Sequence, residues 1–347
     1  MRVGIEVGGT FTDLVMSDGK NIKTAKVPST PASPDEGAML AIKAAGLKLD
    51  EISELIHGST VATNAVLERK GGRVCFFVTR GTKDLLLIQR HDRGAIYDLQ
   101  YQKPRPVVPR HDTYEIDERI AADGNIVTDL DSEVASTLVR DIFEKEKFDS
   151  VAICFLHSYL NSIHERALSD IISALYPGMP ITCSSDVARE FREYERASTT
   201  TLAAYVQPVV AGYISRFSEE LARRGFQGKF SIMQSNGGRM PAAAITKNAI
   251  TALFSGPAAG VVGAIRGKGT TPYPDLITLD MGGTSTDVAL VSNDQVELAP
   301  MTMIDGLPVK TPVVDIVTVG AGGGSIAWVD DGGLLRVGPQ SAGATPG

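Results

Sequence analysis

Cysteine is scarce in this chain of 347 residues, which contains three. Cys75, Cys154 and Cys183 lie far apart, and the first two fall within apolar runs typical of strands. Neither a disulfide framework nor a zinc site can be built from such spacing. The sequence therefore predicts three buried thiols and a reducing, cytoplasmic compartment.

Acidic residues outnumber basic ones: the formal net charge is −7, and no run of lysine and arginine occurs. This balance argues against a nucleic-acid-binding surface. No uninterrupted apolar run reaches membrane-spanning length, and Glu6 and Asp13 interrupt the apolar N-terminus, so we expect no membrane span and no signal peptide. The length and 43% hydrophobic residues suffice for two domains with their own cores.

The most informative motif is repeated. Residues 8–13 are Gly-Gly-Thr-Phe-Thr-Asp, and residues 282–287 are Gly-Gly-Thr-Ser-Thr-Asp. In both copies an apolar run, one acid (Glu6 or Asp280) and one more apolar residue precede the glycines. Each copy predicts a β-hairpin with a Gly-Gly-Thr turn, in which positive φ at glycine lets a ligand approach closely. Two near-identical copies predict two duplicated domains that face one cleft.

The chemistry expected at these turns is phosphate and metal binding. Successive backbone N–H groups and threonine hydroxyls can surround a phosphate. The acid at each strand end, Glu6 or Asp280, can hold a divalent cation through water. Alternatively, Asp13 and Asp280 only bond backbone donors within their hairpins. The predicted phosphate-binding residues are Gly8, Gly9, Thr10, Thr12, Gly282, Gly283, Thr284 and Thr286.

A third glycine-rich stretch, residues 319–326, is Val-Gly-Ala-Gly-Gly-Gly-Ser-Ile. Its residues Gly322, Gly323 and Gly324 can let an adenosine moiety lie against the backbone, and a flexible loop is the alternative. The spacing fits neither the dinucleotide fingerprint nor a Walker loop.

Strands alternate with helices along the first half of the chain, which predicts an α/β fold with a mainly parallel sheet. We expect strands over residues 73–79 and 150–156, and helices over residues 131–147 and 164–176.

Residues 80–119 break this pattern and are expected to form a loop-rich insertion, which in a compact domain is more often functional than accidental. A long helix over residues 198–225, interrupted or kinked at Pro208, is expected to lead into the second domain. The predicted domains are residues 1–196 and 197–347.

Residues 57–65 bring polar groups together where a predicted strand ends and a helix begins. His57 can face the cleft, and Thr60, Thr63 and Asn64 offer hydroxyls and an amide to a small polar ligand. Capping of the helix N-terminus by Ser59 or Thr60 is an equally good explanation.

Within the insertion, residues 90–93 are Arg-His-Asp-Arg. Arg90, Asp92 and Arg93 are expected either to contact substrate or phosphate or to form a solvated loop. Arginine suits planar, bidentate recognition.

Several segments are similar to one family, the hydantoinase/5-oxoprolinase family, and to its hydantoinase A-type subunit. The resemblance runs almost end to end and implies two actin/Hsp70/sugar-kinase-like ATPase domains, the second incomplete because the family subunit is considerably longer. The matching segments are His-Gly-Ser-Thr-Val-Ala-Thr-Asn-Ala at residues 57–65, Glu-Phe-Arg-Glu-Tyr-Glu-Arg at 190–196, Gln-Ser-Asn-Gly-Gly at 234–238, Ser-Gly-Pro-Ala-Ala-Gly at 255–260 and Asp-Met-Gly-Gly-Thr-Ser-Thr-Asp at 280–287.

The resemblance implies ATP-dependent ring opening of a cyclic amide such as a hydantoin or 5-oxoproline, through phosphorylation of the amide oxygen. It implies ATP and Mg²⁺ or Mn²⁺ as cofactors and a hydantoinase B-type subunit as partner in an oligomer. We expect Asp280, Asp13 and His57 to be catalytic, and Glu6 and Asp280 to hold the metal. The alternatives are an ATP-dependent ketone carboxylase subunit and a non-catalytic ATP-binding fragment. The family usually carries Asp where this chain has Glu6.

Overall fold

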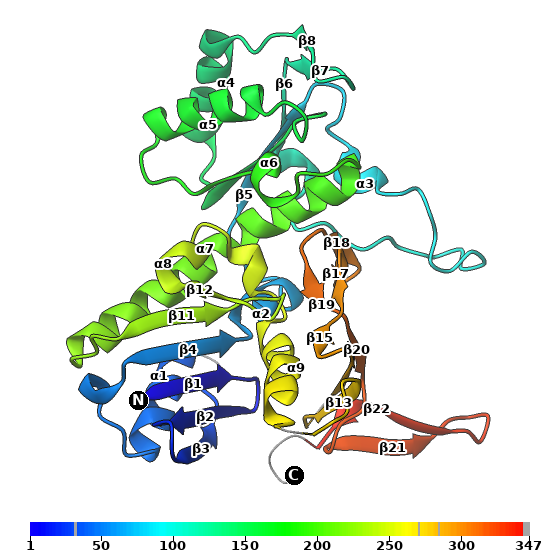
Figure 1. The fold of residues 1–347 in the computed structure, drawn as a ribbon. Coiled ribbons are helices and arrows are strands. Elements are labelled where there is room, and N and C mark those ends of the chain that lie inside the picture. The colour runs from blue at the N-terminus through cyan, green and yellow to red at the C-terminus, as the bar shows by residue number, and fades with distance from the viewer. Residues whose placement is uncertain (31–32, 270, 284, 343–347) are drawn as a thin grey trace.

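The computed structural model describes residues 1–347 apart from 31–32, 270, 284 and 343–347, and Figure 1 shows its layers. The first hairpin lies inside a six-stranded sheet in the order β12-β11-β4-β1-β2-β3. β1 is antiparallel to β2 and parallel to β4, which is parallel to β11. The strands are β1 (Arg2–Val7), β2 (Phe11–Ser17), β3 (Ile22–Pro28), β4 (Glu54–Ser59), β11 (Lys229–Met233) and β12 (Arg239–Pro241).

One face of this sheet forms the main core. Alternation along β1 directs Val3, Ile5 and Val7 to that face, and all three are buried. α1 packs against β1, β2 and β3, and α2 packs against α7. Pro34 is the first residue of α1, as the sequence predicts. The helices around this sheet are α1 (Pro34–Ala44), η1 (Leu49–Glu51), α2 (Val61–Leu67), α7 (Glu193–Arg223), α8 (Ala242–Ile245) and η3 (Ala249–Ala252).

A second sheet, in the upper part of Figure 1, has the order β10-β9-β5-β6 and is parallel throughout. Phe77 of β5 belongs to a core with α4 and α5, whereas Phe76 faces the core that contains α7. The predicted strands and helices of this region are confirmed. The elements are β5 (Val74–Thr79), α3 (Leu85–Ile88), η2 (Arg110–Asp112), β6 (Thr113–Ile116), β7 (Arg119–Ile120), β8 (Ile126–Thr128), α4 (Ser132–Lys145), β9 (Ser150–Cys154), α5 (Ile163–Leu175), β10 (Ile181–Cys183) and α6 (Ser184–Val187).

The second hairpin, β13 and β14, belongs to a third sheet in which β14 also pairs with β15 and β20. Within the described residues β13 pairs only with β14, so it is an edge strand. α9 (Ser255–Gly267) contacts β4 of the first sheet and β13 of the third, and Figure 1 shows it between them. The strands of this region are β13 (Leu276–Met281), β14 (Thr286–Ser292), β15 (Gln295–Val296), β16 (Leu298–Ala299), β17 (Thr302–Ile304), β18 (Leu307–Val309), β19 (Val313–Val314), β20 (Ile316–Val319), β21 (Ser325–Val329) and β22 (Leu335–Ser341).

α7 spans residue 196 and continues through Pro208, and β11 and β12 complete the sheet of the first hairpin. The loop-rich region 80–119 contains α3, η2 and β6, with an extended arm over residues 89–109 that projects from the body in Figure 1.

All three cysteines are free and buried, as predicted. Among the described residues, no helix is long and apolar enough to cross a membrane.

Candidate functional site

The same backbone hydrogen bond closes both Gly-Gly-Thr turns. The Gly8 N–H donates to Phe11 O at 3.1 Å, and the Gly282 N–H donates to Ser285 O at 2.9 Å. Neither Gly8 nor Gly282 has a positive φ, which corrects the expectation from turn chemistry. Space is restricted at Gly8 instead, because a Cβ there would lie 3.1 Å from Phe11 O.

The threonines of the two turns divide into two roles. Thr12 and Thr286 are buried: Thr12 Oγ1 lies 3.1 Å from Ser29 Oγ, and the Thr286 hydroxyl donates to Ala321 O at 2.6 Å. These two hydroxyls therefore brace the hairpins. Thr10 and Gly9 are exposed at the tip of the first turn, as are Gly282 and Gly283 in the second, while Thr284 lies outside the described residues.

The carboxylates of Glu6 and Asp280 lie against one face of α9. A Cβ on Gly256 would clash with Glu6, and a Cβ on Gly260 would lie 3.7 Å from Asp280 Oδ2. Residues four apart share one face of a helix, about 6 Å apart along its axis. The two acids, which come from different sheets, therefore approach each other across the glycine face of α9.

Gly58 completes the enclosure of Glu6. It stands opposite Glu6 in the register of β1 and β4, and a Cβ there would clash with the carboxylate. Burial first, then the negative charges of Asp13 and Asp280, raise the pKa of Glu6 to about 7. A positive charge beside Glu6 would therefore stabilise its ionised carboxylate.

The donor set fits a hydrated divalent cation better than a closed protein cage. In the part of the chain that the structure describes, no three or more His, Cys, Asp and Glu side chains gather to hold a metal. Mg²⁺ is usually bound by one or two carboxylates together with waters and phosphate oxygens. Glu6 and Asp280 can supply those two carboxylates.

Asp13 and His57, both predicted to be catalytic, are engaged elsewhere. Asp13 forms an ion pair with Lys26 at 2.6 Å on the outer part of the hairpin. His57 is buried in the core rather than facing the cleft, which corrects the prediction. Its Nε2 lies 2.6 Å from the Tyr213 hydroxyl, and its ring packs edge-on against Phe217.

The register of the sheet explains the burial of His57. Paired residues on neighbouring strands point to the same face, and His57 pairs with Ile5, a core residue, while Gly58 pairs with Glu6. Burial lowers the pKa of His57 to about 4, so the ring is neutral near pH 7.

A cavity of 460 Å³ adjoins the first turn on the α7 side of the sheet. Gly8, Gly9, Thr60 and Asn64 line it, which brings two of the predicted substrate residues together. Asn64 Nδ2 donates to Thr60 Oγ1 at 3.2 Å. The third, Thr63, accepts a hydrogen bond from the Phe254 N–H at 3.3 Å, which links α2 to the start of α9.

The predicted substrate residues of the insertion do not line this cavity. Arg90 makes a bidentate ion pair with the buried Glu195, and Arg93 donates to Asp98 O at 3.0 Å within the projecting arm. Asp92 lies in the same arm. Tyr97, near the tip of this arm, has 97% of its surface exposed.

The glycine-rich stretch supports the second turn. The Gly323 and Gly324 N–H groups donate to the carbonyls of Gly282 and Gly283 at 2.9 and 2.8 Å. A Cβ on Gly322 would lie 2.5 Å from Gly282 O, so only glycine permits this approach. These amides are therefore occupied by protein carbonyls, and any adenosine contact must use the remaining face of the loop.

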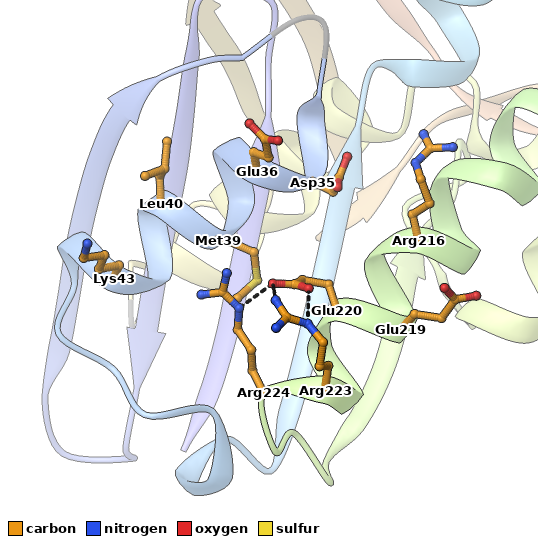
Figure 2. A pocket seen from close by; sticks show the side chains of 10 residues that line it. All are labelled: Asp35, Glu36, Met39, Leu40, Lys43, Arg216, Glu219, Glu220, Arg223 and Arg224. Atoms are coloured by element: carbon orange, nitrogen blue, oxygen red, sulfur yellow. Dashed lines mark hydrogen bonds and ion pairs between the residues drawn. The ribbon is translucent and has the colours of Figure 1, made fainter.

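A larger cavity of 720 Å³ lies away from both turns, between α1 and the C-terminal part of α7 (Figure 2). Its lining is dominated by charged side chains, several of which pair with one another, such as Arg223 with Glu220 at 2.7 Å. Arg216 lines both this cavity and the one beside Gly8. Sequence reasoning missed Arg216, because an arginine on a long amphipathic helix carries no local signal of function.

Comparison with known proteins identifies the class. Residues 2–176 match the family described as the hydantoinase/oxoprolinase N-terminal region, and residues 196–347 match the family described as hydantoinase/oxoprolinase. The chain belongs to the hydantoinase/oxoprolinase family, whose members include ATP-dependent amidohydrolases and carboxylases.

Individual relatives narrow the comparison. Caprolactamase subunit alpha of Pseudomonas jessenii is 35% identical in a match that covers 100% of this chain and 51% of that subunit. The 5-oxoprolinase of Saccharomyces cerevisiae is 33% identical in a match that covers 100% of this chain and 30% of that protein. The crystal structure of the ATP-dependent caprolactamase superposes with a TM-score of 0.88 at 34% identity, covering 100% of this chain and 52% of that chain. The nucleotide-free structure of acetone carboxylase superposes with a TM-score of 0.81 at 28% sequence identity. The match covers 99% of this chain and 51% of that chain. The chain thus spans about half the length of the caprolactamase subunit.

Proposed function

We propose that the two hairpins form an ATP site and that the chain takes part in the ATP-dependent ring opening of a cyclic amide. The observation that carries this proposal is the approach of Glu6 and Asp280, one from each hairpin, to one face of α9. The repeated turn geometry supports the further proposal that residues 1–196 and 197–347 are two actin-like ATPase domains, the second incomplete.

In this proposal Glu6 and Asp280 hold Mg²⁺ or Mn²⁺ through water. Bound to the triphosphate, the cation supplies charge neutralisation during phosphoryl transfer. The N–H groups at the exposed turn residues Gly9 and Gly283, with the hydroxyl of Thr10, orient the phosphates from both sides. Asp13 acts indirectly, because its charge adds to the field that favours a cation at Glu6.

The cavity beside Gly8 and Gly9 holds the cyclic amide. A ring amide is cis, so its N–H and C=O point the same way and can pair with the carboxamide of Asn64. Thr60 fixes Asn64 through their 3.2 Å hydrogen bond. Transfer of the γ-phosphoryl group to the amide oxygen releases ADP and gives a phosphorylated imidate. Water adds to its carbon, and the ring opens when the C–N bond breaks and a proton passes to the nitrogen. A second water then hydrolyses the resulting acyl phosphate to the carboxylate and inorganic phosphate.

The carboxylase alternative has weaker support. The caprolactamase superposes better than acetone carboxylase, with TM-scores of 0.88 and 0.81, and is more similar in sequence. The caprolactamase relative is itself a subunit, which supports a partner subunit for this chain. We propose that this partner is of the hydantoinase B type and that the enzyme is oligomeric and cytoplasmic.

Titration of the chain with a non-hydrolysable ATP analogue tests the proposal. We expect binding only with Mg²⁺, and Asp280→Ala should weaken it about tenfold or more. Asp294→Asn, which removes a charge beyond the other end of β14, is the matched control and should leave the affinity unchanged. Binding that needs no cation, or no binding at millimolar analogue, would overturn the proposed clamp. A positive result justifies assays of hydantoins, 5-oxoproline and ketones with a B-type subunit.

A further inference from the structure

We propose that Arg216 binds a carboxylate carried by the ring substrate, so that the chain prefers acidic cyclic amides to neutral ones. This inference rests on the proposed function, because it assumes a cyclic amide in the 460 Å³ cavity beside Gly8 and Gly9.

The charges that line this cavity do not cancel. Its three charged lining residues are Glu68, Lys70 and Arg216. Lys70 Nζ lies 2.7 Å from Glu68 Oε2, so these two side chains neutralise each other. Arg216 therefore adds a net positive charge to the lining of this cavity, beside the neutral polar groups of Thr60 and Asn64, and Asp35 of α1 lines the larger cavity with it.

The acids on its own helix do not neutralise Arg216. Glu219 and Glu220 follow at the spacing of helical ion pairs. Glu220 instead pairs with Arg223 and Arg224, and Figure 2 shows Arg216 extending away from both glutamates. Within the described part of the chain, Arg216 makes no hydrogen bond and no ion pair.

The guanidinium of Arg216 is suited to bind a carboxylate. A guanidinium presents a planar fork of N–H donors that matches a carboxylate in a bidentate contact. The cavity falls within the range of about 300–1,000 Å³ that is usual for small-molecule sites. Arg216 follows Tyr213 by about one helical turn, and Tyr213 also lines the cavity. A ring held at Asn64 can therefore direct a substituent toward Arg216, and a neutral ring would leave that charge unmatched.

The test compares two ligands that differ only in the carboxylate. 5-Oxoproline and 2-pyrrolidinone share one five-membered lactam, and each is titrated into the chain by calorimetry with Mg²⁺ and the ATP analogue present. We expect 5-oxoproline to bind about tenfold more tightly or better. Arg216→Ala should abolish this preference without changing the affinity for 2-pyrrolidinone, and Arg216→Lys should retain part of it, since lysine keeps the charge without the fork.

Arg223→Ala is the matched control and should retain the full preference, because Arg223 pairs with Glu220 and lines the larger cavity but not the one beside Gly8. Equal affinity for the two lactams, no binding of either, or an equal loss for both in Arg216→Ala would overturn the inference. A loss of ATP-analogue affinity in Arg216→Ala, with 5-oxoproline unaffected, would assign the guanidinium to phosphate instead. Because binding of the analogue is measured separately, the ATP clamp can stand when the carboxylate preference fails.

Discussion

The two Gly-Gly-Thr hairpins share a sequence pattern and a turn, yet the protein surrounds them differently. In the first hairpin Ile5 is 3% exposed, whereas its counterpart in the second, Leu279, is 66% exposed. The acids follow the same contrast, since Glu6 is enclosed by two glycines and Asp280 is exposed. The motif determines the turn, and the neighbouring strands determine how its acid behaves.

The difference arises from the sheets. β1 lies between β2 and β4, so its core face is covered by the helices packed on that sheet. β13 is an edge strand within the described residues and lacks an equivalent of β4. A carboxylate beside β4 is desolvated, and one on an edge strand keeps its water.

The largest expected effect compares Ile5→Ala with Leu279→Ala. Truncation of the buried Ile5 should lower the free energy of unfolding by about 2–5 kcal/mol, because it removes apolar contacts and leaves a cavity. Truncation of the exposed Leu279 should lower the free energy of unfolding by less than about 0.5 kcal/mol. Urea unfolding of both variants measures the two losses. Equal losses would show that the second hairpin is covered in solution and would break the comparison.

The next effect is the pH dependence that Glu6 confers. Its pKa is about 7 in the folded chain and 4.5 as the ordinary value, so the unfolded state loses the proton first. The free energy of unfolding should therefore fall as pH rises from about 4.5 to about 7, by about 3 kcal/mol in total, and level off above pH 7.

Glu6→Gln isolates this contribution from that of His57, whose lowered pKa has the opposite effect between about pH 4 and 6.5. The stability of the wild type relative to Glu6→Gln should decline over the stated range. Asp280→Asn, at the equivalent position of the exposed hairpin, should largely retain the decline. A difference between wild type and Glu6→Gln that does not change with pH would show that Glu6 is ionised in the folded chain.

A smaller difference in stability is expected between alanine substitutions at Gly322 and Gly320, two glycines of one loop. Gly322→Ala places a methyl group 2.5 Å from Gly282 O and 2.8 Å from Gly283 C, and neither backbone atom can move without opening the second turn. We expect a loss of about 1–3 kcal/mol. Gly320→Ala, where nothing lies within 4 Å of the added atom, is the control. Thermal unfolding measures both variants, and similar losses would argue against the bracing role of Gly322.

Local patterns were sufficient to predict much of this fold. Apolar runs bounded by turns identified both hairpins and the buried strand β5, and Pro34 marked the start of α1. These features depend on residues close in sequence. The acids that form the site were also predicted, because each stands at a fixed distance from its Gly-Gly-Thr turn.

The rest depends on pairings that sequence alone does not reveal. The side to which His57 points depends on its register with Ile5, and its hydrogen-bond partner Tyr213 comes from a distant helix. The alternating charges of residues 190–196 are typical of a solvated surface, yet Arg196 is fully buried beside Glu165, with hydrogen bonds to Phe155 O and two serines.

The central claim, that the two hairpins form one site, is tested most directly by a double-mutant cycle. The affinity for Mg²⁺ and the ATP analogue is measured for the wild type, Glu6→Gln, Asp280→Asn and the double variant. If both carboxylates hold one cation, the double variant should lose no more than the worse single variant, with a coupling energy of about 1 kcal/mol or more. Losses that simply add would mean that Glu6 and Asp280 act independently, and would contradict the account.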